Sequence, residues 1–146
     1  MNIEQLREEL KIDEGVKYEI YLDHLGLPTC GIGHLIKDTD PEHGLPIGAE
    51  IPEERVNELF EEDLKITVDE CKLIYNDFDD LPKEAQHIIA NMMFNMGRPR
   101  LSRFHKMKQA VDNRDWQEAS VQMKDSRWYK QVTNRAERLC ERMRNV

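Results

Sequence analysis

Apolar side chains recur at intervals of three and four residues along most of the chain, the spacing of amphipathic helices. The first such segment covers residues 2–13, with Asn2 placed as N-cap and Gln5 as its capping-box partner. Gly15 follows as a helix stop, so Glu14 is expected at the carboxyl end of this helix. A carboxylate there meets the unfavourable end of the helix dipole, which suits a group that must keep its proton.

The segment after this helix changes to the alternating pattern of β-strands. Residues 18–34 alternate in this way, and a turn is expected at 23–26. Apolar residues are expected on one face of the first strand: Tyr18, Ile20 and Leu22. Residues 37–50, rich in Asp, Pro and Gly, are expected to form a loop.

The helical pattern returns after the loop and continues to the end of the chain. Pro52 opens a helix predicted to reach residue 75, and its length of about 36 Å suits a link between two lobes. A second helix is predicted between Pro82 and Gly97, apolar around much of its circumference like the central helix of a bundle. Three shorter helices are indicated near residues 104–111, 116–123 and 135–143.

Composition places the chain among single-domain proteins with a real core. It has 146 residues, 39% of them hydrophobic, and no apolar run of the roughly 20 residues that a membrane span requires. The first residues lack the pattern of a signal peptide, so synthesis in a cytosol is expected. Three cysteines without metal-type spacing predict free thiols: Cys30, Cys71 and Cys140.

The net charge of -8 is unevenly distributed. Residues 1–80 carry -15 and residues 81–146 carry +7. The basic part could face a polyanion such as a cell-wall polymer or nucleic acid, or the two parts could be ordinary solvated faces of one soluble protein. No nucleic-acid recognition motif is present and the acidic part would repel DNA, so no nucleic-acid partner is expected.

The acidic loop invites comparison with a calcium site, because Asp38, Asp40 and Glu42 alternate. The EF-hand pattern fails, since His43 stands where glycine is needed and Ala49 where a bidentate Glu is needed. We therefore expect a solvated acidic loop, and neither a metal nor another cofactor.

The candidate catalytic residues lie between Glu14 and His34. Glu14 and Asp23 offer two carboxyl groups with different neighbours, which glycosidic-bond cleavage requires: one is the protonated acid and one the ionised base. The hydroxyl of Thr29 is able both to accept a hydrogen bond from water and to donate one to it. Glycines in the same segment permit sharp turns and a close approach of substrate to the backbone.

Four blocks along the chain together resemble one known family. They are Glu14-Gly15, the run Tyr-x-Asp-x-x-Gly-x-x-Thr-x-Gly-x-Gly-His at 21–34, Asn-Met-Met-Phe-Asn-Met-Gly at 91–97, and Ser-Arg-Trp-Tyr at 126–129 followed by Asn-Arg-Ala at 134–136. In this order they resemble the T-even bacteriophage lysozymes (endolysins) of glycoside hydrolase family 24.

The resemblance implies a mostly helical α+β fold with two lobes within one lysozyme domain at 1–146. The implied parts are a sheet-bearing lobe at about 14–51, a connecting helix at about 52–75, and a helical lobe at about 81–146 on which helix 2–13 packs. It also implies inverting hydrolysis of the β-1,4 bond between N-acetylmuramic acid and N-acetylglucosamine in peptidoglycan.

Matched position by position, the resemblance implies that Glu14 is the general acid and that Asp23 with Thr29 activates water. Arg135 matches a residue that pairs with the catalytic Glu. Such a pairing favours the ionised acid, so either burial offsets it or substrate binding breaks it. His34 matches a buried structural partner of Asp63. Expected substrate-contacting positions are His34, Leu35, Met92, Phe94, Asn95 and Arg135.

The favoured function is a phage endolysin, made in the host cytoplasm and acting on the wall in the periplasm after membrane permeabilisation. Peptidoglycan is the expected partner, with no stable membrane insertion, and a monomer is expected because no unexplained apolar stripe stands out. The alternatives are a virion-associated lysozyme and a non-catalytic cell-wall-binding module of the same fold. The joint presence of Glu14, Asp23 and Thr29 argues against the module.

Overall fold

A computed structural model describes all residues, Met1 to Val146. Contacts within it divide the chain into a sheet-bearing unit at 7–66 and a helical unit formed by 1–6 and 67–146. The boundary passes through two helices, α1 (Ile3–Glu14) and α2 (Glu53–Ile74), so each contributes residues to both units. The finer division into two lobes and a connecting helix stays a prediction.

The sheet-bearing unit contains a small antiparallel sheet in the order β1 (Lys17–Leu22), β2 (Pro28–Gly31) and β3 (His34–Leu35). On the other edge of β1, residues 48–51 run antiparallel to it, with a bridge between Glu19 and Glu50. On the expected apolar face of β1 only Ile20 is buried, whereas Tyr18 and Leu22 are about half exposed. Of these three apolar residues, Ile20 alone therefore contributes to the core.

Helix α2 covers β2 closely. A Cβ atom on Gly31 would lie 3.2 Å from a methyl carbon of Val56, so this position leaves no room for a larger side chain. Buried residues of the unit include Ile20, Ile32, Ile51, Leu59 and Leu64. Three of the four residues of β2, Thr29 among them, are buried.

The loop at 37–50 is not the solvated acidic loop that its composition indicated. Glu42 is buried and accepts hydrogen bonds from the guanidinium of Arg55, the shortest at 2.9 Å. Asp40 is bound to the ring of His34. Among the three alternating acids only Asp38 is exposed. The loop's acids therefore hold it against the rest of the unit.

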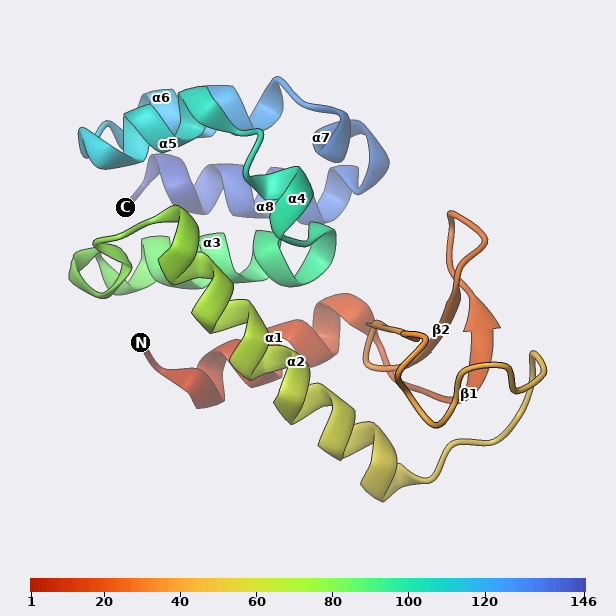
Figure 1. Cartoon of the computed structure of the whole chain (residues 1–146). Helices are drawn as coiled ribbons and strands as arrows, with labels where there is room; N and C mark the ends of the chain where they lie inside the picture. The colour runs from red at the N-terminus through yellow and green to blue at the C-terminus, as the bar shows by residue number, and fades with distance from the viewer. The chain divides into compact units, whose positions relative to one another are not determined.

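The helical unit is built around α3 (Lys83–Met96), which is buried along most of its length. Helix α8 (Thr133–Arg144) packs against α3, and α6 (Trp116–Lys124) packs against both α8 and α5 (His105–Asp112). Figure 1 shows α3 beside α8 and α5 beside α6. Shorter elements complete the unit: η1 (Phe78–Asp80), α4 (Arg98–Leu101) and α7 (Arg127–Gln131). The mostly helical α+β fold is thus confirmed.

Candidate active site

Glu14 is the last residue of α1, as its sequence context indicated. Gly15 ends the helix in the left-handed region, at φ +71°, and its N–H donates to the carbonyl of Lys11 at 3.0 Å. A Cβ on Gly33 would lie 2.6 Å from Oε1 of Glu14. The Glu14 carboxyl group therefore rests directly against the backbone at Gly33, and a Cβ there would require the carboxyl group to move.

Asp23 is held by the turn between β1 and β2. Its Oδ1 accepts two backbone N–H groups, from Leu25 and Leu27, both at 2.9 Å. Its own N–H donates to the carbonyl of Leu27 at 3.0 Å, and Gly26 supplies the positive φ of +79° that the turn needs. Both side-chain bonds use Oδ1, so the turn orients the carboxylate and leaves Oδ2 for another donor.

The side chain of Thr29, on β2, is bonded to the backbone of the same residue as the side chain of Asp23. Its hydroxyl donates to the carbonyl of Leu27 at 2.9 Å, and the residue is only 4% exposed. Leu27 thus bonds the side chains of both Asp23 and Thr29 through its backbone. With its single proton used, the hydroxyl of Thr29 is left as an acceptor for a further donor such as water.

Tyr21 is a site residue that the sequence analysis did not single out. It is the Cα partner of Thr29 across β1 and β2. Burial raises the pKa of its phenol, and the nearby charges of Glu14 and Asp23 raise it further. Its place two residues before Asp23 in the Tyr-x-Asp motif was the signal that could have found it.

Comparison with known proteins identifies the family of this chain. A family model described as "Phage lysozyme" matches residues 11–145. The chain belongs to the phage lysozyme family. It is therefore a glycoside hydrolase, and the family places it among the peptidoglycan hydrolases.

Individual relatives agree with the phage lysozyme family. The chain is 32% identical to "Probable T4-type lysozyme 2" of Dictyostelium discoideum, over 94% of this chain and 92% of that protein. It is 28% identical to "Pre-baseplate central spike protein Gp5" of Enterobacteria phage T4, over 92% of this chain and 26% of the spike protein. It is 26% identical to "Peptidoglycan hydrolase gp36" of Pseudomonas phage phiKMV, over 94% of this chain and 15% of that hydrolase.

His34 of this phage lysozyme has no ring nitrogen left for a substrate. Nδ1 lies 2.6 Å from Asp63 and Nε2 lies 2.8 Å from Asp40, and the residue is 3% exposed. The geometry supports the structural role expected with Asp63 and speaks against substrate contact. Leu35, the next residue on β3, is about half exposed.

The expected contact residues of the helical unit have different surroundings. Met92 is fully buried, whereas Phe94 is partly exposed. Asn95 accepts a hydrogen bond from the indole N–H of Trp128 at 2.7 Å. Arg135, on α8, donates through Nε to Oδ1 of Asn91 at 2.8 Å. The roles of Phe94 and Asn95 toward substrate stay predictions. So does the pairing of Arg135 with Glu14, because these two residues belong to different units.

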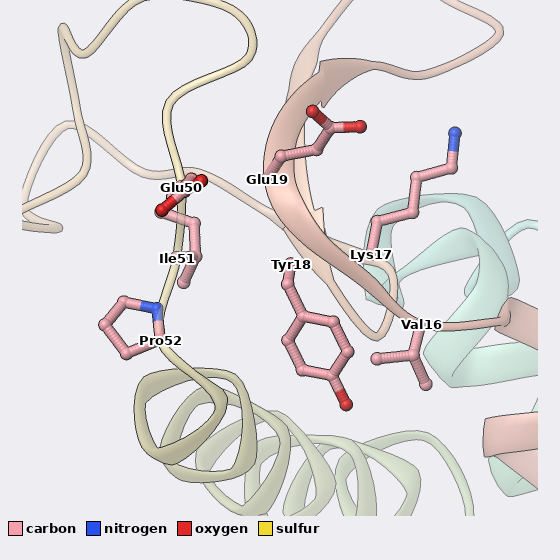
Figure 2. Close-up of a pocket in the computed structure, with 7 residues that line it drawn as sticks. All are labelled: Val16, Lys17, Tyr18, Glu19, Glu50, Ile51 and Pro52. Carbon is pink, nitrogen blue, oxygen red and sulfur yellow. The ribbon is translucent and has the colours of Figure 1, made fainter.

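A hollow of about 660 Å³ in the sheet-bearing unit is lined by residues 16–19 and by residues 50–52. Figure 2 shows Tyr18 pointing away from the side on which Lys17 and Glu19 project. Glu14, Asp23 and Thr29 do not line this hollow. A hollow of about 380 Å³ in the helical unit lies beside Phe104, His105 and Gln122.

No group of three or more His, Cys, Asp or Glu side chains is arranged to hold a metal ion. None of the helices combines the length and the apolar character that crossing a membrane would demand. All three cysteines are free and buried, as their spacing predicted.

Proposed function

We propose that this phage lysozyme is a muramidase that cleaves the β-1,4 bond between N-acetylmuramic acid and N-acetylglucosamine with inversion. Glu14 acts as the general acid, and Asp23 with Thr29 activates the attacking water. The proposal deepens the family's peptidoglycan-hydrolase activity by assigning the bond, the stereochemistry and the residues.

The bonding of the Asp23 and Thr29 side chains to the backbone of one residue, Leu27, carries the proposal. Leu27 holds Oδ1 of Asp23 through its N–H and the hydroxyl of Thr29 through its carbonyl. Oδ2 of Asp23 and a lone pair of Thr29 then remain as two acceptors. A water donating one proton to each has both hydrogens engaged, so a lone pair of its oxygen is free to attack the anomeric carbon.

The reaction follows from these roles. The water oxygen bonds to the anomeric carbon while its proton passes to Asp23, and the bond to the glycosidic oxygen breaks as Glu14 protonates that oxygen. An inverting enzyme requires about 6.5–9.5 Å between the two carboxyl groups, which leaves room for the water. Glu14 lies at the end of α1 and Asp23 lies in a separate turn, so the two carboxyl groups have different environments. This supports separate roles for them as acid and base.

The decisive experiment compares the wild type with Glu14→Gln and Asp23→Asn on peptidoglycan. Glu14→Gln keeps the shape but has no proton to transfer, so we expect turnover to fall about a thousand-fold or more, at the limit of detection. Asp23→Asn should be strongly impaired and could retain partial activity.

Two readouts complete this experiment. Solution NMR of the products should show the new reducing end first as the α-anomer, because inversion at a β-linkage gives that anomer. Circular dichroism of each variant controls for folding. Full activity of a folded Glu14→Gln would refute the assignment of the acid, and binding to the wall without cleavage by the wild type would favour a non-catalytic module.

The biological role we propose is that of an endolysin, a monomer made in the host cytoplasm that reaches the periplasmic wall after membrane permeabilisation. The phage family supports a role in infection, whereas similarity to a T4 spike protein makes a virion-associated lysozyme the second candidate. Expression in a Gram-negative cytosol should leave cells intact until a membrane-permeabilising agent is added. Mass spectrometry of purified virions would detect the protein only under the second candidate.

A further inference from the structure

Tyr21 stands among the residues assigned to catalysis without a role of its own. The strand register places it opposite Thr29, and residues directly opposite each other in an antiparallel pair project to the same face of the sheet. After burial, the charges of two carboxyl groups raise the pKa of its phenol. They are Glu14, at the end of α1, and Asp23, in the turn after β1. Tyr21 therefore lies opposite Thr29 and two residues before Asp23, where the charges of both carboxyl groups act on its phenol.

The ring of Tyr21 is held in place by a cation. The ammonium nitrogen of Lys17 lies 4.3 Å from the ring centroid. In a regular strand the two residues would be about 13 Å apart along the chain. The register between β1 and β2 shifts between Lys17 and Tyr21, and such a bulge bends the strand and brings its side chains together. The contact thus depends on a specific irregularity of β1.

We propose that Tyr21 is a positioning residue of this lysozyme, whose ring, held by Lys17 and set opposite Thr29, forms the wall between the carboxyl groups of Glu14 and Asp23. A neutral ring keeps bulk water from the space between an acid that must hold its proton and a base that must lose it. It also fixes the side chains on either side, as a packed neighbour fixes rotamers. This inference rests on the proposed roles of Glu14 and Asp23.

Burial, and then the nearby acidic groups, raise the pKa of the Tyr21 phenol above its ordinary value. Burial, Glu14, Asp23 and then Cys30 on β2 all raise the pKa of the phenol. The hydroxyl therefore stays protonated over the neutral pH range, and adds no third negative charge to the site. Loss of the ring would admit water to the space between the two carboxyl groups, and the pH–rate profile is the measurement that reports on the acid and the base.

The test is the pH dependence of kcat and KM for Tyr21→Leu, measured as release of reducing ends from soluble, uncrosslinked peptidoglycan strands. We expect kcat to fall at least ten-fold with KM within about three-fold, and the alkaline limb of the profile to move to lower pH. Tyr21→Phe keeps the wall and should retain at least a third of the wild-type kcat. Folding is checked by circular dichroism.

The matched control is Tyr18→Leu, the same change three residues earlier on β1. Tyr18 is 49% exposed and points away from the face that carries Lys17 (Figure 2). This control should keep the wild-type kcat and pH profile. A folded Tyr21→Leu that matches Tyr18→Leu in both measures would overturn the proposal.

Lys17→Met decides the question if Tyr21→Leu fails to fold, because it removes the cation and keeps the length of the side chain. A drop in kcat of about three-fold or more with a shifted alkaline limb supports the proposal, and a wild-type rate and profile overturn it. The wild type and Glu14→Gln are run beside these variants. An inactive wild type would overturn the proposed function itself, whereas an active wild type with an inactive Glu14→Gln leaves only the role of Tyr21 in question.

Discussion

The position of Glu14, the proposed general acid, depends on the absence of a side chain at Gly33. Gly33 adopts φ +62°, in the left-handed region, and an added Cβ would lie 2.6 Å from Oε1 of Glu14. That separation is shorter than a non-bonded contact allows, so any side chain at this position displaces either the turn between β2 and β3 or the carboxyl group. Gly33 therefore has two separate reasons to be glycine, its backbone conformation and the acid.

Gly33→Ala should lower both the free energy of unfolding and kcat, and the loss in kcat should exceed that caused by a comparable change elsewhere in the sheet-bearing unit. The left-handed backbone alone costs about 1–2 kcal/mol for a residue with a Cβ. Displacement of the Glu14 carboxyl should lower kcat about ten- to a hundred-fold, since misplacement by about 1 Å has effects of this size. Steady-state kinetics and urea denaturation measure the two effects.

Gly44→Ala is the control for Gly33→Ala. Gly44 also has a positive φ, +87°, but a Cβ there would meet nothing within 4 Å. It should show a similar loss of stability with an unchanged kcat. Equal kinetics for the two variants would contradict the role of Gly33 in placing Glu14.

Sequence reasoning proposed candidate site residues where side-chain chemistry was visible, and it did not find the backbone groups that hold them. Glu14, Asp23 and Thr29 were recognisable as two carboxyl groups and a hydroxyl in a glycine-rich segment. Leu27 was not, because its contribution comes from an N–H and a carbonyl that every residue other than proline possesses. His34 was expected both to be structural and to contact substrate, and only its bonds to two carboxylates distinguish the roles.

At the scale of elements, His34 connects three segments of the sheet-bearing unit. It begins β3, binds Asp63 of α2 through Nδ1, and binds Asp40 of the loop at 37–50 through Nε2. Burial alone would lower the pKa of His34, but the hydrogen bonds to Asp63 and Asp40 outweigh it and raise the pKa. Burial opposes ionisation of Asp40 as well, yet the Lys37 N–H and His34 lower its pKa overall.

The signs of these shifts define the pH range in which the network stabilises the fold. A raised histidine pKa gives stability that is complete below the unfolded value of about 6.5 and is lost as pH rises through the folded value. A lowered aspartate pKa gives stability that is present above about 3.9 and is lost as pH falls through the folded value. The contribution is therefore greatest in mildly acidic solution.

Asp40→Asn should destabilise the protein at pH 5.5 much more than at pH 8.5. The loss at pH 5.5 should be about 1–3 kcal/mol, the range for a hydrogen bond to a charged group. Urea denaturation at the two pH values measures it. Asp38→Asn, an exposed change two residues away in the same loop, should have little effect at either pH. A pH-independent loss in Asp40→Asn would show that His34 is not the charged partner.

The lengths of the elements decided which of them could be predicted. Helices of eight residues or more, such as α2 and α3, show enough apolar repeats to be located within a few residues. The four-residue α4 and five-residue α7 complete too few repeats to be distinguished from loops, and the two-residue β3 shows no alternation. The attachment of the acidic loop was not predicted, because its acids bind His34 and Arg55, which both lie outside the loop.

At the scale of the whole molecule, the two units are linked by shared helices. Residues 3–6 of α1 belong to the helical unit and the rest of α1 to the sheet-bearing unit, and α2 is divided after Ile66. Unfolding of either unit removes part of a helix on which the other depends. We therefore expect the two units to unfold in one cooperative transition, as most single domains of this size do.

The three buried cysteines allow this cooperativity to be measured. Cys30 belongs to the sheet-bearing unit, and Cys71 and Cys140 belong to the helical unit. Burial raises the pKa of these thiols to about 11, about 12 and about 11 in that order, so little reactive thiolate exists in the folded protein at pH 8. Pulsed alkylation across a urea series, read by peptide mass spectrometry, should give one midpoint for all three, coincident with loss of helical circular dichroism. Labelling of Cys30 at clearly lower urea would mean that the sheet-bearing unit opens alone, and that the shared helices do not couple the two units.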